Sequence, residues 1–309
     1  MKAATGTGKY ERILLRCERL AAVPTAVAHP CEASALTGAI EAAKQGLITP
    51  LLVGPAARIT EIAAAESIDL RDIQIIDVPD GQSGAKAVEL IREGKAEILM
   101  KGSLHTDELM AAVVSRERGL RTSRRISHAF LMDVPTYHKV LVITDAAINI
   151  APTLEDKVDI CQNAIDLARS LGVEEPKVAI LAAVETVNSK MPATTDAAAL
   201  CKMADRGQIT GALLDGPLAF DNAISKDAAR TKGIRSMVAG DPDILLAPDL
   251  EAGNMLAKQL TFLAHADSAG LVLGARVPVI LTSRADSVRS RIASCAVAML
   301  VAHARREKV

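Results

Sequence analysis

The sequence predicts an α/β protein with largely parallel sheets, for three reasons. Short apolar runs rich in β-branched residues alternate with longer stretches of helical periodicity, as in strand-helix-strand units. Aromatic residues make up only 2% of the chain, so Ala, Val, Ile and Leu must fill the core, which suits close-packed helix and sheet layers. The clearest helical stretches each end at a glycine, which tolerates the positive φ common at helix ends.

Three helices are predicted from these terminal glycines, at Glu32–Gln45, Ser83–Glu93 and Leu154–Leu171. Thr153 should cap the third, because Asp156 follows three residues later and completes a carboxylate variant of the capping box. The predicted strands are Thr25–Ala28, Pro50–Gly54, Ile73–Val78, Glu97–Lys101, Val140–Thr144, Val178–Val184, Gly211–Leu214, Ile244–Ala247 and Val277–Leu281.

The chain is expected to form two compact lobes. It contains no 20- to 50-residue repeat, which excludes solenoids. The polar, Arg-rich stretch Arg116–Arg125 is the expected break, and a last strand-helix unit from about Val272 should return to the first lobe. The first α/β lobe is thus predicted to hold residues 1–120 and 272–309, and the second to hold residues 121–271.

Composition excludes several classes of protein. The scarcity of aromatic residues argues against stacking platforms for single-stranded nucleic acid, and the net charge of -1 provides no global attraction for anions. Five cysteines without a C-x-x-C pair favour neither a disulfide framework nor a zinc site, and fit a reducing cytoplasm. No apolar run approaches the roughly 18 residues of a membrane span, and the N-terminus lacks the apolar block of a signal peptide.

Familiar phosphate and hydrolase motifs are not found. Gly6-Thr7-Gly8-Lys9-Tyr10 ends like a phosphate-binding loop, but no strand precedes it, and we expect a mobile tail there. The chain has no G-x-G-x-x-G after a strand, no G-x-S-x-G elbow and no H-E-x-x-H.

Polar residues gather instead where predicted strands end, which is where ligands bind in open α/β sheets. Five such loops stand out. They are Gly102–Asp107, Asp145–Asn149, Asp215–Pro217, Asp249–Asn254 and Ser283–Ser287.

The last of these loops carries the strongest chemistry. The planar guanidinium of Arg284 can bind a tetrahedral oxyanion through two hydrogen bonds while Ser283 donates a third. Transfer of a group to phosphate would require such donors. The alternative is a surface ion pair between Arg284 and Asp286, which would contribute little. We favour the functional interpretation because Ser283 and Arg284 stand directly after the end of a predicted buried strand.

The other loops admit both structural and functional interpretations. Lys101 ends an apolar strand and can point its ammonium at a cleft, whereas His105 could simply cap or pack within its turn. Asn254 could cap a helix over Met255–Phe262, with Gly253 easing the turn, or the two could bind an anionic or carbonyl oxygen. A cluster of arginines is either a solvated face or a contact for nucleotide phosphates; its members are Arg116, Arg118, Arg121, Arg124 and Arg125.

Four of these segments together resemble the phosphate acetyl/butyryltransferase family. The resemblance keeps the motif order and covers nearly the whole chain from about Thr25. The segments are Asp145-Ala-Ala-Ile-Asn149, Asp215-Gly-Pro-Leu218, Pro248-Asp-Leu-Glu-Ala-Gly-Asn254 and Ser283-Arg-Ala-Asp-Ser287.

The resemblance implies an isocitrate/isopropylmalate dehydrogenase-like fold, a two-lobed three-layer α/β/α architecture with a cleft between the lobes, usually as a homodimer. It also implies reversible acyl transfer from coenzyme A to inorganic phosphate, without a metal or another cofactor. Ser283 would then hydrogen-bond the thioester or thiolate, and Arg284 would neutralise phosphate and the developing charge. The expected substrate-binding residues are Lys101, Gly102, Ser103, His105, Thr106, Asp145, Asn149, Asp249, Gly253 and Asn254.

Two departures from acetyl-specific members favour a butyryl-like or broader acyl preference. Met110 stands where those members have an arginine, and Lys101 is expected to supply the missing charge. Ser290 stands where they have an aspartate that acts as base, and Asp286 is the expected substitute. Two other classes remain open: a metal- and NAD-dependent decarboxylating dehydrogenase of the same fold, and a non-catalytic acyl-CoA sensor.

Overall fold

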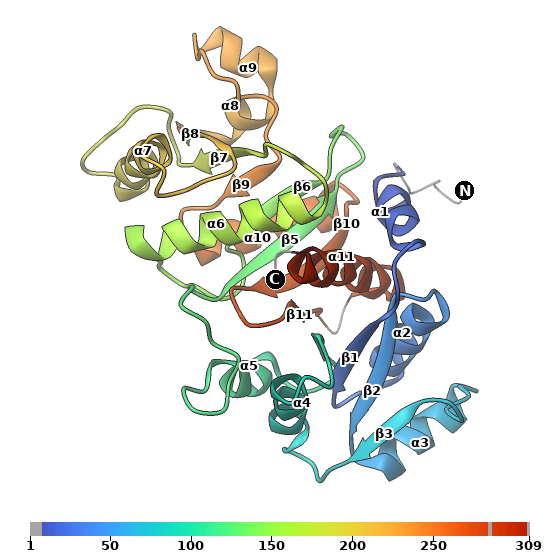
Figure 1. Cartoon of the computed structure of the whole chain (residues 1–309). Coiled ribbons are helices and arrows are strands. Elements are labelled where there is room, and N and C mark those ends of the chain that lie inside the picture. The colour runs from blue at the N-terminus through green and yellow to red at the C-terminus, as the bar shows by residue number, and fades with distance from the viewer. Residues whose placement is uncertain (1–7, 284–285, 308–309) are drawn as a thin grey trace. The chain divides into compact units, whose positions relative to one another are not determined.

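The structure is a computed structural model that describes residues 8–283 and 286–307 (Figure 1). The chain divides into two compact units. One, here called the β6 unit, takes the described residues up to Lys9 together with Arg125–Ser268. The other, the β1 unit, takes Tyr10–Arg124 and the described residues from Ala269 on. Each unit is a sheet covered by helices, so the predicted α/β class is confirmed.

The β1 unit is wound in two directions from its first strand. Its strands lie in the order β3-β2-β1-β4-β11-β10, and all neighbours are parallel except β10 and β11. The strands are β1 (Val23–Ala28), β2 (Ile48–Gly54), β3 (Gln74–Asp77), β4 (Ile98–Lys101), β10 (Asp267–Leu273) and β11 (Val279–Ile280). Its helices are α1 (Lys9–Cys17), α2 (Ala33–Lys44), α3 (Ala56–Ala65), α4 (Ser83–Arg92), α5 (Thr106–Val114) and α11 (Val288–Arg306).

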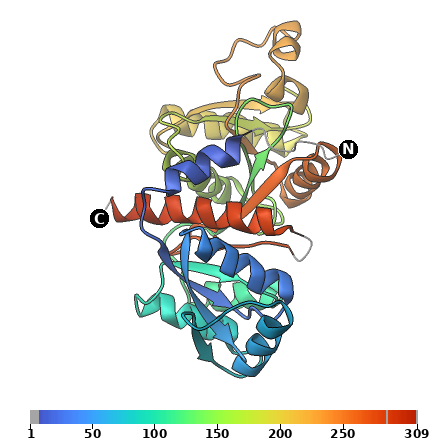
Figure 2. The same cartoon turned by 90° about the vertical axis from the view of Figure 1, so that its right-hand side faces the viewer.

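The connections of this unit create a switch point between β1 and β4. The chain runs outward from β1 through β2 to β3 and then returns across the sheet to β4, so right-handed crossovers place α2 and α3 on one face and α4 on the other (Figures 1 and 2). α11 packs against α2, and α4 packs against α5. Loops diverge at such a point and leave a crevice beyond the strand ends, which is where open α/β sheets bind ligands.

The β6 unit has the strand order β5-β6-β9-β7-β8, in which β5 is antiparallel to β6 and the others are parallel. Its strands are β5 (Ser127–Asp133), β6 (Leu141–Thr144), β7 (Lys177–Leu181), β8 (Leu213–Leu218) and β9 (Ile244–Leu246). Its helices are α6 (Leu154–Ser170), α7 (Pro192–Asp205), α8 (Phe220–Ile224), α9 (Lys226–Thr231) and α10 (Leu250–Leu263). Apolar side chains from β5, β6, β7 and β9 form a core with residues of α8, α9 and α10.

The predicted helix signals are confirmed. Thr153 caps α6 through the reciprocal pair with Asp156, whose amide lies 3.2 Å from the Thr153 hydroxyl. Gly46, Gly94 and Gly172 follow their helices with φ of 71°, 72° and 86°. No helix in residues 8–283 and 286–307 is long and apolar enough to cross a bilayer.

Two strands, β5 and β10, were not predicted, and two local predictions are wrong. Asp215 lies inside β8 rather than beyond its end, because the strand continues through Gly216 and Pro217. α1 begins at Lys9, so Lys9 and Tyr10 do not belong to a mobile tail: both are buried, and the Lys9 ammonium lies 2.8 Å from Asp133.

Candidate active site

Three of the predicted strands deliver their ends to one edge of the β1 unit. β4 lies between β1 and β11, parallel to both, with Lys101 beside Ala28 and Met100 beside Ile280. Their carboxyl ends therefore lie side by side, and two polar loops predicted from the sequence, beginning at Gly102 and Ser283, start there.

The loop after β4 is packed tightly onto the end of β1. A side chain at Gly102 would place its Cβ 2.3 Å from the carbonyl oxygen of His29, so only glycine fits. The Ser103 hydroxyl donates to the same oxygen at 2.9 Å and accepts from the Cys31 amide at 3.3 Å. Ser103 is 8% exposed, and its hydroxyl joins two strand ends.

Lys101 is buried at this edge, with 4% of its surface exposed. Its ammonium donates to the carbonyl oxygens of Gly102 and Leu104, each at 3.2 Å, so the charge is held inside its own loop. Lys101 also acts on Asp286, whose carboxyl pKa its positive charge lowers. The structure thus brings Lys101 into electrostatic reach of the loop after β11.

Ser283 and Asp286, which follow β11, are joined by two hydrogen bonds. The Ser283 amide donates to the Asp286 carboxylate at 2.6 Å, and the Asp286 amide donates to the Ser283 carbonyl at 3.2 Å. Burial raises the pKa of the Asp286 carboxyl, against the Ser283 amide and the charges of Arg291 and Lys101. Arg284 lies outside the described residues. A half-buried carboxyl with a raised pKa holds its proton more tightly than an exposed one, which suits a group that accepts and returns a proton.

Ser290, which stands where acetyl-specific members have an aspartate, has a structural role. Its amide donates to the hydroxyl of Ser287, the N-cap of α11, at 3.1 Å. Ser290 is 8% exposed, and its carbonyl accepts from Ser294 at 2.8 Å. The predicted shift of the carboxylate from this position to Asp286 fits that arrangement.

Sequence reasoning missed two residues at this edge. His29 follows β1 with a φ of 55°, and its Nδ1 lies 3.1 Å from the Ser83 hydroxyl. Arg291 of α11 is 2% exposed and donates to Thr282 and Ser283. His29 could have been found as the polar residue at a strand end. Arg291 gave no signal, because an arginine within a helix is usually exposed.

His105 and Thr106 lie farther along the loop, at the start of α5, and both are exposed. His105 is the N-cap residue by backbone conformation, with φ of -65° and ψ of 149°, but its ring makes no capping hydrogen bond. The structure therefore leaves the His105 side chain on the surface beside the loop rather than packed within it.

In the β6 unit, Asp145 and Asn149 organise the loop after β6. The Asp145 carboxylate accepts from the amides of Ala147, Ile148 and Asn149 at 2.8, 3.0 and 3.2 Å, and from the Asn149 side chain at 2.5 Å. The Asn149 oxygen accepts from Arg125 at 2.7 Å. Both residues are almost fully buried, so their polar atoms hold the loop together.

The loop after β9 lies beside it, because β6 and β9 are parallel neighbours. Asp249, not Asn254, is the N-cap: its side chain accepts from the Ala252 amide at 2.9 Å, and α10 begins at Leu250. Asn254 lies inside the helix and donates to the Ala146 carbonyl at 3.0 Å. Gly253 is required, because a Cβ there would lie 2.3 Å from the Asp145 carbonyl oxygen.

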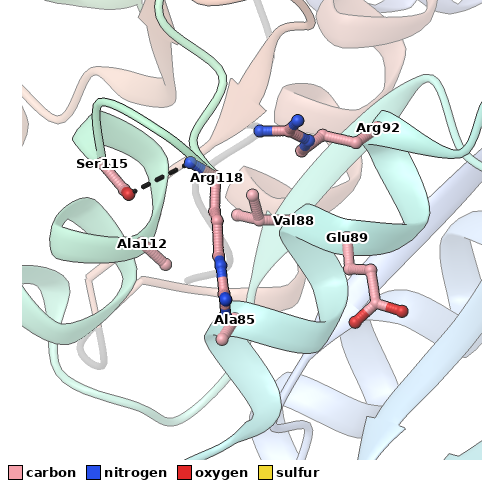
Figure 3. Close-up of a pocket in the computed structure, with 7 residues that line it drawn as sticks. All are labelled: Ala85, Val88, Glu89, Arg92, Ala112, Ser115 and Arg118. Carbon is pink, nitrogen blue, oxygen red and sulfur yellow. Dashed lines mark hydrogen bonds between the residues drawn. The ribbon is translucent and has the colours of Figure 1, made fainter.

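The arginine cluster does not act as one surface. Arg125 binds Asn149 and lies 3.2 Å from the Asp156 carboxylate, whereas Arg118 lines a pocket of about 450 Å³ between α4 and α5. The Arg118 side chain extends toward Ala85, with Arg92 at the other end of the pocket (Figure 3). None of the predicted site residues lines this pocket.

The cysteines offer no activated nucleophile. Burial raises the pKa of Cys17 and Cys31 to about 11 and that of Cys161, Cys201 and Cys295 to about 12. All five thiols therefore stay protonated at neutral pH, and none is prepared to take an acyl group.

Comparison with known proteins identifies close relatives over almost the whole chain. The family model described as "Phosphate acetyl/butaryl transferase" matches residues 82–299. A phosphate acetyltransferase of Rhizobium meliloti is 64% identical, over 96% of this chain and 95% of its own length. A phosphate butyryltransferase of Clostridium acetobutylicum is 40% identical, over 95% and 98%.

A solved structure shares the fold. The branched-chain phosphotransacylase from Enterococcus faecalis V583 is 31% identical and superposes with a TM-score of 0.79, over 91% of this chain and 99% of that one.

Proposed function

The chain belongs to the phosphate acetyl/butyryltransferase family, and we propose that the polar edge of its β1 unit carries the family's reaction. The chain is a phosphate acyltransferase: it transfers an acyl group reversibly between coenzyme A and inorganic phosphate. The observation that supports this site most directly is the pair of hydrogen bonds that joins Ser283 to Asp286, beside the buried Lys101.

In the proposed reaction, an oxygen of hydrogen phosphate attacks the thioester carbonyl carbon directly. The C–S bond then breaks, the thiolate of coenzyme A leaves, and the acyl group remains bonded to phosphate. Asp286 takes the phosphate proton and returns one to the departing thiolate, so that acyl phosphate and free coenzyme A result. The raised pKa of Asp286 supports this role, because a carboxyl that holds its proton more tightly can both accept and return it.

Charge in this reaction would be handled by three groups. Arg284 neutralises phosphate and the tetrahedral oxyanion, and Ser283 donates a hydrogen bond to the thioester or thiolate. Lys101 adds a fixed positive charge from inside its loop. No metal or redox cofactor takes part in this scheme, and activity should survive an excess of chelator.

The acyl preference is proposed to be broad. The relative from Rhizobium meliloti, named a phosphate acetyltransferase, supports acetyl-CoA as a substrate. Met110 and Ser290, the two positions that depart from acetyl-specific members, support acceptance of a longer chain such as butyryl. Met110 is buried in α5, at 9% exposure, so it supplies apolar volume where those members carry a charge.

We propose that the enzyme works as a cytoplasmic homodimer. Met255, Phe262 and Leu263, all on α10, are 59%, 70% and 79% exposed, which is unusual for apolar side chains of this size. A second copy of the chain is the partner that would cover them.

Release of free thiol from acyl-CoA tests the proposed function. Purified protein should release thiol from acetyl-CoA and butyryl-CoA only when phosphate is present, and should form acyl phosphate in equal amount. Thiol release without phosphate would indicate a hydrolase. Reduction of NAD with a hydroxy acid and a divalent metal would support the dehydrogenase alternative.

A further inference from the structure

The structure assigns Arg291 as the residue that positions Ser283 and Asp286 for acyl transfer, an inference that rests on the proposed function. Arg291 lies one turn into α11, nine residues after Thr282. It is a positioning residue and is not proposed to touch substrate.

Its guanidinium binds two residues that follow β11. Nη1 donates to the Thr282 hydroxyl at 2.6 Å, and Nη2 donates to the Ser283 carbonyl oxygen at 3.1 Å. The Ser283 amide is held from the other side by the Asp286 carboxylate at 2.6 Å. The Ser283 peptide groups are therefore fixed at both their donor and their acceptor, and this sets the direction in which the hydroxyl leaves the backbone.

Burial of this arginine is costly. Arg291 is 2% exposed, the one arginine that is buried in the described part of the chain, and its Nε finds no hydrogen-bond partner. Burial lowers the pKa of its guanidinium, which the carboxylates of Asp286 and Glu32 and the Cys295 thiol oppose. Well-packed apolar side chains are often at least as stable as buried charges, so stability alone gives no reason to keep an arginine here.

The packing around Arg291 is adapted to it. Gly38 of α2 faces the arginine stem, and a Cβ at that position would lie only 2.6 Å from Arg291 Cδ. α2 therefore has no side chain at the point where the arginine stem packs against it. Gly38→Ala should displace the arginine without changing its chemistry, which provides an independent test.

Arg291 also affects the proton on Asp286. Its positive charge lowers the pKa of the Asp286 carboxyl, as does the charge of Lys101 on β4, and both act against the stronger effect of burial. Removing the Arg291 charge should therefore raise the Asp286 pKa further. If the ionised carboxylate is the base, the acidic limb of the rate profile should move to higher pH.

The experiment compares Arg291→Met, Arg291→Lys and Gly38→Ala with the matched control Arg289→Ala. Arg289 is on the same helix but exposed, and pairs with Glu11 at 2.9 Å. We expect Arg291→Met and Gly38→Ala to lower kcat on the order of 10²-fold, as a misplacement of about 1 Å can, with much smaller changes in KM. The control should keep the wild-type kcat.

The pH profile separates positioning from simple loss of stability. Arg291→Met should move the acidic limb of the pH–rate profile to higher pH. Arg291→Lys keeps the positive charge, so its acidic limb should stay near that of the wild type, although its kcat should still fall. Wild-type kcat in both Arg291→Lys and Gly38→Ala would overturn the inference. A lower melting temperature with unchanged kcat and an unchanged limb would also overturn it.

A failure of the proposed function can be told apart from a failure of this inference. If wild-type protein releases no thiol in the presence of phosphate, the proposed function fails, and the positioning role is then read from hydrogen exchange at the Ser283 amide. Faster exchange there in Gly38→Ala than in Arg289→Ala would support the role of Arg291. Equal exchange would overturn it.

Discussion

At Asp286, burial and neighbouring charges shift the carboxyl pKa in opposite directions. Burial raises the pKa of its carboxyl, and the Ser283 amide, Arg291 and Lys101 act in the other direction. An aspartate whose pKa is raised in the folded state is protonated more readily after folding, so it favours folding at low pH and loses that contribution as pH rises through the raised pKa. The ionised form that the proposed reaction uses is thus the one that favours folding less.

Replacing Asp286 with asparagine should separate these two properties. Asp286→Asn is expected to lower kcat by about 10²-fold to 10⁴-fold and to abolish the acidic limb of the rate profile, because the base is lost. Its melting temperature at neutral pH should not fall, since an amide oxygen can still accept from the Ser283 amide. The exposed Asp72 supplies the control Asp72→Asn, which should resemble wild type; an unchanged acidic limb in Asp286→Asn would assign the base elsewhere.

Arg284→Ala tests whether Arg284 neutralises phosphate and the tetrahedral oxyanion. The loss of an oxyanion donor costs on the order of 10²-fold to 10³-fold in kcat, and we expect that loss together with weaker phosphate binding. The KM for acyl-CoA should change less. Steady-state kinetics with varied phosphate measure both values, and near-normal turnover would refute the assigned role of Arg284.

At this scale the sequence predicted the position of the proposed reacting groups better than that of their supports. Ser283 and Asp286 follow a strand that could be recognised, so their place at the sheet edge was predictable. The burial of Arg291 could not be predicted, because its packing against Gly38 depends on α2 lying against α11. Helix-to-helix contacts between residues so distant in sequence leave no local pattern.

Among the elements, the junction of β1 with β4 depends most on a single glycine. Gly102 leaves β4 so close to β1 that its Cβ would lie 2.3 Å from the His29 oxygen and 2.5 Å from the Ala28 oxygen. Its amide donates to Ala28 at 2.8 Å, so the loop cannot move away without losing a hydrogen bond. Lys101 and Ser103 flank this contact on either side.

Gly102→Ala should therefore reduce both stability and activity. Overpacking of this kind typically costs about 1–3 kcal/mol, which denaturant unfolding can measure. Gly84→Ala is a matched control in α4, because a Cβ there meets Leu104 at 3.4 Å, an ordinary contact. Equal stability of the two variants would contradict the tight packing of the β4 loop.

The secondary structure was predictable where one pattern dominated. Most buried parallel strands and the three glycine-ended helices followed from periodicity. β5 and β10 did not, because β5 opens with polar Ser127 and His128, and β10 opens with Asp267 and Ser268. These polar residues are buried in the fold, apart from the half-buried Asp267, and local sequence gives no sign of that.

For the whole molecule, α10 is the surface that we propose a second copy of the chain covers. Leu256 and Leu260 pack against the core of the β6 unit, while Met255, Phe262 and Leu263 are exposed. A helix with apolar residues on more than its core-facing side is typical of a contact with another subunit.

Phe262→Glu combined with Leu263→Glu should convert the proposed homodimer into monomers, because two charges would have to be buried in the interface. Light scattering during size-exclusion chromatography measures the mass. Met237→Glu is the control, since Met237 is 72% exposed in the same unit but lies outside α10. Loss of the dimer only in the control would place the interface away from α10.

The buried thiols have a practical consequence at the bench. A colour reagent that reacts with thiolates should detect liberated coenzyme A while the native enzyme itself stays nearly silent, because each of its cysteines holds its proton to a pKa of about 11 or 12. Unfolding would expose these side chains to the same dye. One reagent can thus follow turnover in the folded enzyme and report its denaturation.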